Sequence, residues 1–153
     1  MFEINKFSGE FRYLSNFFKS KFVDNGQTEW QTVEHYFQAA KTTNPFWKTI
    51  IWEAPTPAIA KQMGRQAPLI STWDSIKVDV MRDALKYKFD QNSDLKEKLM
   101  SLKDIYLEEG NTWHDNLWGN CTCSKCKKVT GQNLLGNLLM TLRDDYLKKE
   151  NYE

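Results

Sequence analysis

The chain has 153 residues, with 21 Lys and Arg against 20 Asp and Glu, a net charge of +1, and 41% hydrophobic residues. These values are typical of a single folded domain and exclude a disordered chain, because 14% aromatic residues can bury a sizeable core. The near-neutral charge also excludes histone-like binding, so a polyanionic partner would need a local basic patch.

The first thirty residues predict strands. Phe2 and Ile4 alternate with polar neighbours, and the runs 19–23 and 27–30 flank an Asp24-Asn25-Gly26 turn. This pattern predicts a small antiparallel hairpin near the N-terminus.

Helical spacing of apolar residues dominates the rest of the chain. N-cap residues, prolines and glycines delimit predicted helices over residues 32–41, 45–54, 57–64, 72–89, 94–102 and 132–148. A short strand is predicted around Ile105–Leu107, ended by Gly110-Asn111, and a polar, irregular stretch follows from Thr112 to Thr130. The fold class is therefore α+β, with residues 1–153 forming one compact, helix-rich domain and a small N-terminal antiparallel β element.

The cellular compartment is predicted from three features. No apolar run approaches the roughly 20 residues that a membrane-spanning helix needs, and Glu3 and Lys6 interrupt any signal-peptide core. The cysteines are clustered as Cys121-x-Cys123-x-x-Cys126, unlike a disulfide framework joining distant segments. A cytoplasmic protein with no membrane partner is expected.

A polar row lies on the helix predicted from Thr32. Glu34, Gln38 and Lys41 are spaced i, i+4 and i+7, so a carboxylate, an amide and an ammonium share one face. Such rows are commonly solvated. Here the helix follows an aromatic-rich hairpin, which favours enclosure of the row and shifted pKa values.

Two further segments combine polar and small residues. Trp113 to Asn120 is an irregular, Trp-rich segment whose rings either stack on a heterocycle or pack into the core. Gly131 to Gly136 begins the last helix, where a glycine either admits a phosphate or allows tight helix packing.

The cysteines form a candidate metal site. Cys121, Cys123 and Cys126 can converge on one Zn²⁺, and His114 can supply the fourth ligand from the same loop. Free thiols in a reducing compartment are the alternative, because the spacing is not a doubled C-x-x-C.

Taken in order, these segments resemble the NADAR family, which is associated with NAD and ADP-ribose metabolism. The matching pieces cover nearly the whole chain: 11–18, 30–41, 63–65, Trp73-Asp74 with Met81, Lys88-Phe89, Trp118-Gly119 and 131–143. The loop after Gly119 departs from the family, because many members carry a glycine-rich stretch where this chain has its cysteines.

The resemblance implies an N-glycosidase, a hydrolase that cleaves the bond between ribose C1 and a base nitrogen. The expected substrate is ADP-ribosylated guanine in DNA, releasing ADP-ribose, with the basic residues Lys125, Lys127 and Lys128 as a local contact for the polyanion. The alternative substrates are phosphorylated ribosylamino-pyrimidine intermediates of riboflavin biosynthesis. A module that binds ADP-ribose or NAD without cleaving it is the alternative of another class.

The resemblance also implies roles for individual residues. Glu34 is expected to transfer a proton to the departing amine, or Lys41 to form a Schiff base with a ring-opened sugar, and Asp115 to orient water or stabilise positive charge. The expected substrate-binding residues are Asn16, His35, Gln38, Arg65, Trp73, Trp118, Gly119, Asn133, Gly136 and Arg143. Arg143 serves alternatively in a structural ion pair. No cofactor is expected for catalysis, and a zinc ion would be structural.

Overall fold

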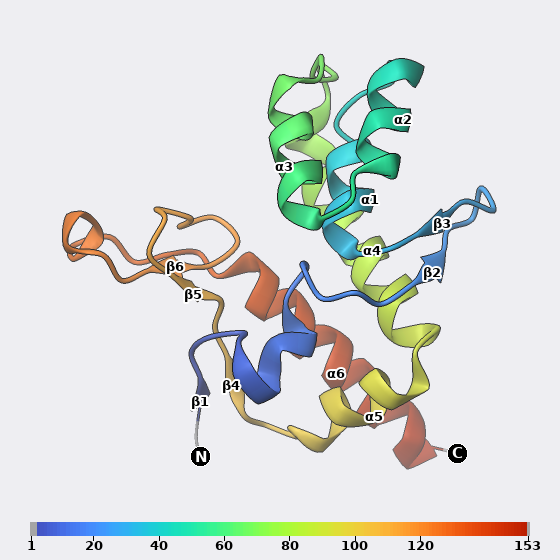
Figure 1. Cartoon of the computed structure of the whole chain (residues 1–153). Coiled ribbons are helices and arrows are strands. Elements are labelled where there is room, and N and C mark those ends of the chain that lie inside the picture. The colour runs from blue at the N-terminus through green and yellow to red at the C-terminus, as the bar shows by residue number, and fades with distance from the viewer. Residues whose placement is uncertain (1–2, 153) are drawn as a thin grey trace. The chain divides into compact units, whose positions relative to one another are not determined.

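The computed structural model describes residues 3–152, so the expected strand residue Phe2 lies outside the described residues. The chain divides into two compact units (Figure 1): unit 1 comprises residues 1–15 and 94–153, and unit 2 comprises residues 16–93. Most of the described structure is helical, with small two-stranded sheets, which confirms the predicted fold class. The expectation of a single domain over residues 1–153 stays a prediction.

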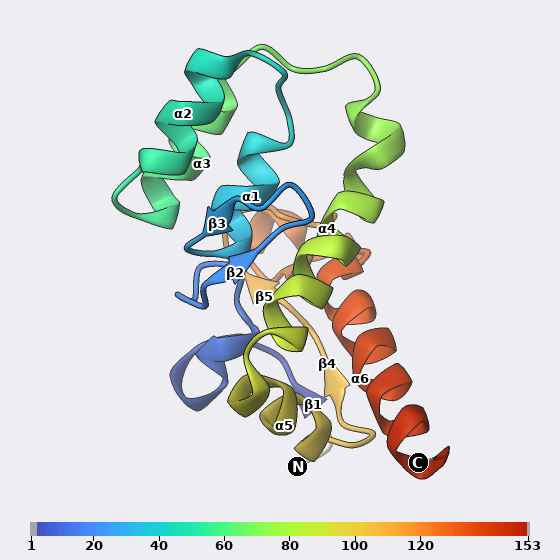
Figure 2. The same ribbon diagram turned by 90° about the vertical axis from the view of Figure 1, so that its right-hand side faces the viewer.

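Unit 2 begins with the predicted hairpin, in which β2 (Phe22–Val23) pairs antiparallel with β3 (Glu29–Trp30). Helices α1 (Val33–Ala39), α2 (Pro45–Glu53), α3 (Pro57–Gln66) and α4 (Trp73–Asp90) follow. Helix α1 packs against each of the other three (Figure 2). It is therefore the central element of this unit, and the side chains on its polar row are largely enclosed.

The capping residues of unit 2 explain where its helices begin. The side chain of Thr32 accepts the His35 N–H, and the side chain of Asn44 accepts the N–H groups of Phe46 and Trp47. Thr56 caps α3 in the same way. The predicted starts are confirmed, whereas α3 continues two residues beyond Gly64, the predicted end.

Unit 1 contains short paired strands and helices that the sequence patterns predicted only in part. Strand β1 (Glu3–Ile4) pairs in parallel with β4 (Tyr106–Leu107), and β5 (Gly110–Asn111) pairs with β6 (Asn120–Cys121). Helices α5 (Ser93–Ser101) and α6 (Leu134–Tyr152) complete the described regular elements together with two 3₁₀ helices, η1 (Gly9–Leu14) and η2 (Ser124–Cys126).

Three local expectations for unit 1 were wrong. Residues 9–14 form η1 rather than a strand, and the stretch 112–130 contains β6 and η2 rather than being wholly irregular. Helix α6 begins at Leu134 rather than Gln132, because Asn133 has a φ of +51°, outside the helical region.

Within the described residues, every helix is too short or too polar to cross a membrane.

Candidate active site

Helix α1 carries a buried carboxyl group held by specific contacts. Glu34 is 7% exposed, and its side chain accepts a hydrogen bond of 2.7 Å from the Gln38 amide, one turn along the helix. Its backbone N–H donates to the carbonyl oxygen of Asn16 at 3.1 Å. The predicted enclosure of this polar row is therefore present at its first two positions.

Burial raises the pKa of Glu34 above that of an ordinary glutamate. The hydrogen bond from Gln38 and the charges of Lys61 and Lys41 act in the opposite direction but are the smaller effects. Such a carboxyl retains its proton to higher pH than a solvated one and can donate it to a leaving group.

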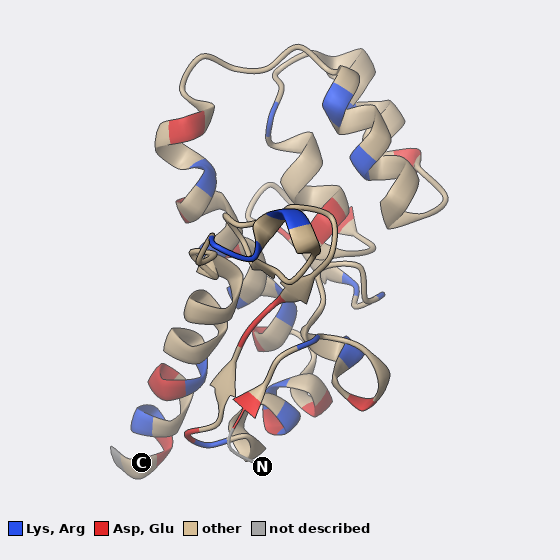
Figure 3. Cartoon of the chain, turned by 90° about the vertical axis from the view of Figure 1, so that its left-hand side faces the viewer, with Lys and Arg blue, Asp and Glu red and all other residues tan. Residues whose placement is uncertain are grey.

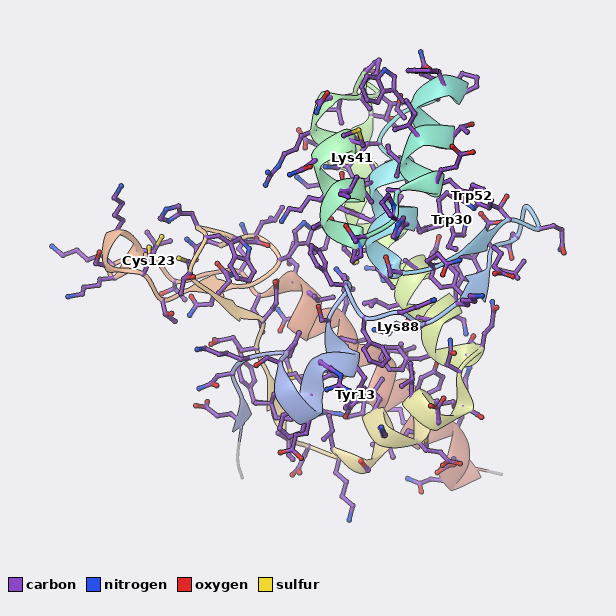
Figure 4. The ribbon with its side chains drawn as sticks, in the orientation of Figure 1. Tyr13, Trp30, Lys41, Trp52, Lys88 and Cys123 are labelled. Carbon is purple, nitrogen blue, oxygen red and sulfur yellow. The ribbon has the colours of Figure 1, made fainter. Side chains whose placement is uncertain are left out.

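Basic side chains face this carboxyl within unit 2. Lys41 follows α1 and lies beside the Phe37 ring, with its Nζ 5.7 Å from the ring centroid (Figure 4). Burial lowers the pKa of Lys41; the charge of Glu34 raises it, and Arg65 and Lys61 lower it. The site thus holds a lysine with an increased neutral fraction close to a protonatable carboxyl, which suits both proposed routes of bond cleavage.

Gly64 makes the contact between Glu34 and Gln38 possible. A Cβ atom at Gly64 would lie 1.9 Å from Gln38 Oε1 and 3.0 Å from Gln38 Cβ, so only a glycine on α3 leaves the amide in place. The sequence showed Gly64 as part of a motif, but its role depends on the packing of α3 on α1.

Replacing Gly64 with Ala is expected to raise the pKa of Glu34 further. The added methyl displaces the Gln38 amide, and loss of its hydrogen bond removes an interaction that favours the ionised carboxylate. We expect a net destabilisation of about 1 kcal/mol, since overpacking exceeds the gain in helix propensity. Carbon-detected NMR titration of the glutamate carboxyls would measure the shift. Gln62→Ala, an exposed position on α3, is the control, and an unchanged Glu34 titration in Gly64→Ala would contradict the expectation.

Two residues that hydrogen-bond to Glu34 each carry a buried oxygen atom that accepts no hydrogen bond from any residue that the structure describes. The two atoms are Asn16 Oδ1 and Gln38 Oε1. The amide nitrogens are engaged: Asn16 Nδ2 lies 3.5 Å from Met81 Sδ and Gln38 Nε2 donates to Glu34. Buried acceptors without a donor are costly. Gln38 Oε1 lies directly under Gly64 of α3, which leaves Asn16 Oδ1 as the acceptor suited to a hydroxyl or amino donor of a ligand.

Two other predicted binding residues of unit 2 are engaged in packing. Both ring nitrogens of His35 have partners, Thr32 Oγ1 at 2.7 Å and the Ala54 carbonyl oxygen at 2.9 Å. Trp73 is buried with its ring 5.0 Å from that of Phe37.

A cavity of about 460 Å³ lies beside His35. It is lined by Phe17, Lys19, Gln31, Thr32, His35, Trp52, Glu53, Ala54, Pro55 and Pro57. Glu34 and Lys41 do not line this cavity, so it is separate from the polar row.

In unit 1, Asp115 shapes the loop that precedes β6. Its Oδ1 accepts the backbone N–H groups of Leu117 and Trp118, at 3.1 and 2.9 Å. Asn111 holds the same loop, because its side-chain oxygen accepts the N–H groups of Trp113 and Asp115. Trp118 is half-buried. Asp115, which was predicted to be catalytic, is thus fixed in a turn next to Trp118, which was predicted to bind substrate.

The start of α6 does not offer the phosphate site that its sequence suggested. The N–H groups of residues 132–135 donate to the carbonyl oxygens of Asn116, Gly119, Leu117 and Trp118, so the loop occupies the donors that would otherwise bind an anion. The packing alternative for Gly136 is the one observed, since a Cβ there would lie 2.2 Å from the Leu107 carbonyl oxygen.

Asn133 and Arg143 join α6 to the segment around β4. The Asn133 side chain donates to the Leu107 carbonyl oxygen at 2.9 Å and accepts the Glu109 N–H at 3.0 Å. Arg143 is 3% exposed, donates to the Ile105 carbonyl oxygen and pairs with Asp144. The structural ion pair considered for Arg143 is therefore present, and binding roles for both residues stay predictions.

The predicted metal ligands lie together at one end of unit 1. The ligand atoms of His114, Cys121, Cys123 and Cys126 are all within 4.8 Å of one another. This cluster could hold a metal ion.

The structure groups the predicted residues into two sets. Within unit 2 it brings Glu34, Gln38 and Lys41 together, with Arg65 exposed on α3; within unit 1 it brings together the Asp115–Gly119 loop and the start of α6. Sequence reasoning gave no role to Lys61, which contributes to the charge around Glu34. It named Lys88 only as part of a matching family piece and did not predict that this lysine is fully buried (Figure 4). The spacing of apolar residues along a helix does not show which lysines become buried or lie near a carboxyl, so the sequence offers no signal for either residue.

Comparison with known proteins identifies a family and several relatives. The model of the NADAR domain matches residues 4–147. The chain is 37% identical over 139 residues to N-glycosidase YbiA of Escherichia coli, covering 90% of this chain and 82% of that protein. It is 37% identical over 123 residues to an N-glycosidase of Nostoc punctiforme, covering 77% and 75%.

A third relative is the chloroplastic riboflavin biosynthesis protein PYRR of Zea mays, 38% identical over 130 residues, covering 77% of this chain and 20% of that protein. The NMR structure of E. coli YbiA superposes with a TM-score of 0.83 at 33% identity, over 99% of this chain and 87% of that one. The expected enzyme class, a hydrolase acting on N-glycosyl compounds, is confirmed by the N-glycosidase homologues. The chain belongs to the NADAR family.

Proposed function

We propose that this chain hydrolyses the bond between ribose C1 and the nitrogen of an ADP-ribosylated guanine in DNA and releases ADP-ribose. The observation that carries the chemistry is the buried Glu34 carboxyl, whose pKa is raised by burial. Asn16, whose carbonyl oxygen accepts the Glu34 N–H, adds a buried Oδ1 to which no described residue donates. A protonated carboxyl can protonate the departing amine, while the amide oxygen can accept a ribose hydroxyl or an amino group.

Two routes are open to these residues. In the first, Glu34 protonates the leaving nitrogen and water attacks C1. In the second, the neutral amine of Lys41 replaces the base amine on C1 of the ring-opened sugar. This forms a new C–N bond and releases the base as its amine, and water then hydrolyses the Lys41 imine. Borohydride present during turnover separates the routes, because it traps an imine on Lys41 only in the second.

DNA as the carrier of the modified guanine is supported by the loop that holds the cysteines. Lys125, Lys127 and Lys128 are all exposed there, and Figure 3 shows positive charge on this loop. Exposed lysines contact a phosphate backbone without reading its sequence. The proposed reaction uses water as the co-reactant and needs no catalytic cofactor.

A phosphorylated ribosylamino-pyrimidine of riboflavin biosynthesis is the second candidate substrate. It is favoured by the maize relative, whose name places it in riboflavin biosynthesis. The same carboxyl and lysine would act on this molecule, because it also carries an amine on ribose C1, and the exposed Arg65 would bind its phosphate.

A direct assay distinguishes the candidates. Purified protein is incubated separately with ADP-ribosylated guanine in a DNA oligonucleotide and with the ribosylamino-pyrimidine phosphate, and products are followed by mass spectrometry. We expect free ADP-ribose from the first. Ribose 5-phosphate from the second substrate alone would move the function to the riboflavin intermediates. Tight binding measured by calorimetry, with neither product formed, would instead show a module that binds ADP-ribose or NAD.

A further inference from the structure

We propose that His114, Cys121, Cys123 and Cys126 form a structural Zn²⁺ site that closes the loop carrying Asp115 and Trp118. The four ligand atoms lie within 4.8 Å of one another. Figure 4 shows Cys123 among the sulfur atoms at the tip of this loop. This proposal is independent of the substrate and of the bond that the protein cleaves.

The distances around the histidine agree with a tetrahedral ion. His114 Nδ1 lies 3.3 Å from Cys123 Sγ, 3.4 Å from Cys126 Sγ and 3.9 Å from Cys121 Sγ. A tetrahedral zinc ion with bonds of about 2.0 Å to nitrogen and 2.3 Å to sulfur places the nitrogen and each sulfur about 3.5 Å apart. One ring nitrogen has a single hydrogen or a single lone pair, so it cannot hydrogen-bond to three sulfurs at once. A shared cation accounts for the convergence of all three.

The surroundings of the sulfurs also suit thiolates. The backbone N–H of His114 donates to Cys121 Sγ at 3.3 Å, and the Asn116 amide donates to Cys126 Sγ at 3.4 Å. Hydrogen bonds of this kind orient ligands and stabilise their charge in metal sites. Three thiolates and a dication leave one negative charge, and Lys125 and Lys127, which flank Cys126 in the sequence, carry the opposite charge.

The backbone is shaped to bring the ligands together. His114 has a φ of +70°, a conformation that non-glycine residues adopt only when other interactions enforce it. The Cys126 N–H donates to the Cys123 carbonyl oxygen in the short helix η2, so both sulfurs are presented from one turn. Asn116 ties the two ends of the loop, because its side-chain oxygen accepts the Cys121 N–H at 2.9 Å.

All four coordination positions are filled by protein side chains, which is the arrangement of a structural zinc ion rather than a catalytic one. The ion would join residue 114 to residues 121–126 and so enclose Asp115, Trp118 and Gly119 in a metal-closed loop. The ion would fix the conformation of this loop, in which the carbonyl oxygens of residues 116–119 accept the N–H groups of residues 132–135 at the start of α6.

The test is the metal content of the full chain purified without chelators and dialysed after addition of zinc. We expect about one zinc per chain in the wild type and in Ser124→Ala, the exposed neighbour of a ligand, and less than about a tenth of that in Cys123→Ser. Hydrogen exchange at residues 112–131 is expected to speed up in Cys123→Ser and in wild type stripped by a strong chelator, while α4 stays protected.

A second measurement keeps the test decisive if Cys123→Ser does not fold. Wild-type protein loaded with Co²⁺ should show the visible absorption of a tetrahedral ion and a thiolate-to-cobalt charge-transfer band. The proposal is overturned if the wild type retains no zinc and shows no such band, if Cys123→Ser retains as much zinc as Ser124→Ala, or if intact-mass analysis finds two of the cysteines joined in a disulfide in the purified protein.

Discussion

Replacing Glu34 with Gln is expected to lower the rate of ribose–base bond cleavage by about two to four orders of magnitude. Glutamine keeps the shape of the side chain and can still pair with the Gln38 amide, but it cannot supply a proton to the departing amine. The effect should appear in kcat and in kcat/KM alike, because the interaction that is lost forms only as the bond breaks. Release of ADP-ribose followed by mass spectrometry measures both.

The pH profile gives this prediction a specific signature. Because the acid form of Glu34 is the active one, wild-type activity should fall as pH rises through the pKa of Glu34, which burial raises. The residual activity of Glu34→Gln should lack this limb. Glu97→Gln, an exposed position on α5, is the matched control and should retain wild-type rates. Full activity in a folded Glu34→Gln protein would remove Glu34 from the mechanism.

Replacing Lys88 with Met is expected to flatten the pH dependence of stability above neutral pH. Lys88 is 0% exposed, with its Nζ 5.1 and 5.9 Å from the centroids of Phe89 and Phe18. Burial lowers its pKa to about 7. Between that value and the ordinary lysine pKa, the unfolded chain binds a proton that the folded chain lacks, so the free energy of unfolding rises with pH.

The size of the effect follows from the same shift. Each pKa unit corresponds to about 1.4 kcal/mol, so Lys88 should contribute a rise of roughly 3 kcal/mol between pH 7 and 9.5 in the wild type. The partly buried Lys41 and Lys48, whose pKa values burial also lowers, contribute with the same sign in both proteins and cancel in the difference.

Urea unfolding at several pH values measures this difference directly. Lys86→Met is the control, because Lys86 lies on the same helix, is exposed and pairs with Asp90 at the surface. Its slope with pH should match that of the wild type. An equally steep slope in Lys88→Met would show that Lys88 is charged in the folded protein.

Much of the helical framework could be predicted from the sequence because its signals are local. Thr32, Asn44 and Thr56 precede their helices as N-caps, and each accepts the backbone N–H groups that a cap must satisfy. The hairpin of β2 and β3 follows from its Asp-Asn-Gly turn, and Met81, Leu85 and Phe89 are buried along α4 as their spacing predicted. Glu34 and the cysteine cluster could also be identified from the sequence, because residue type and spacing within one short segment single them out.

Other features depend on contacts between distant segments, which periodicity does not report. The pairing of β1 with β4 and of β5 with β6 joins residues far apart in the chain, and two-residue strands carry too few residues to show alternation.

The sequence by itself determined the order of the helices, the family and the chemical character of the polar row, since these follow from residue type and spacing. Only the tertiary structure decided which polar groups are free to act. Packing of α3 on α1 buries Glu34 and leaves room for Gln38 at Gly64, while the Asn116–Gly119 loop occupies the N–H groups at the start of α6. Burial and hydrogen-bond pairing arise from the neighbours that folding brings together, and those neighbours set the pKa of a carboxyl and the availability of a donor.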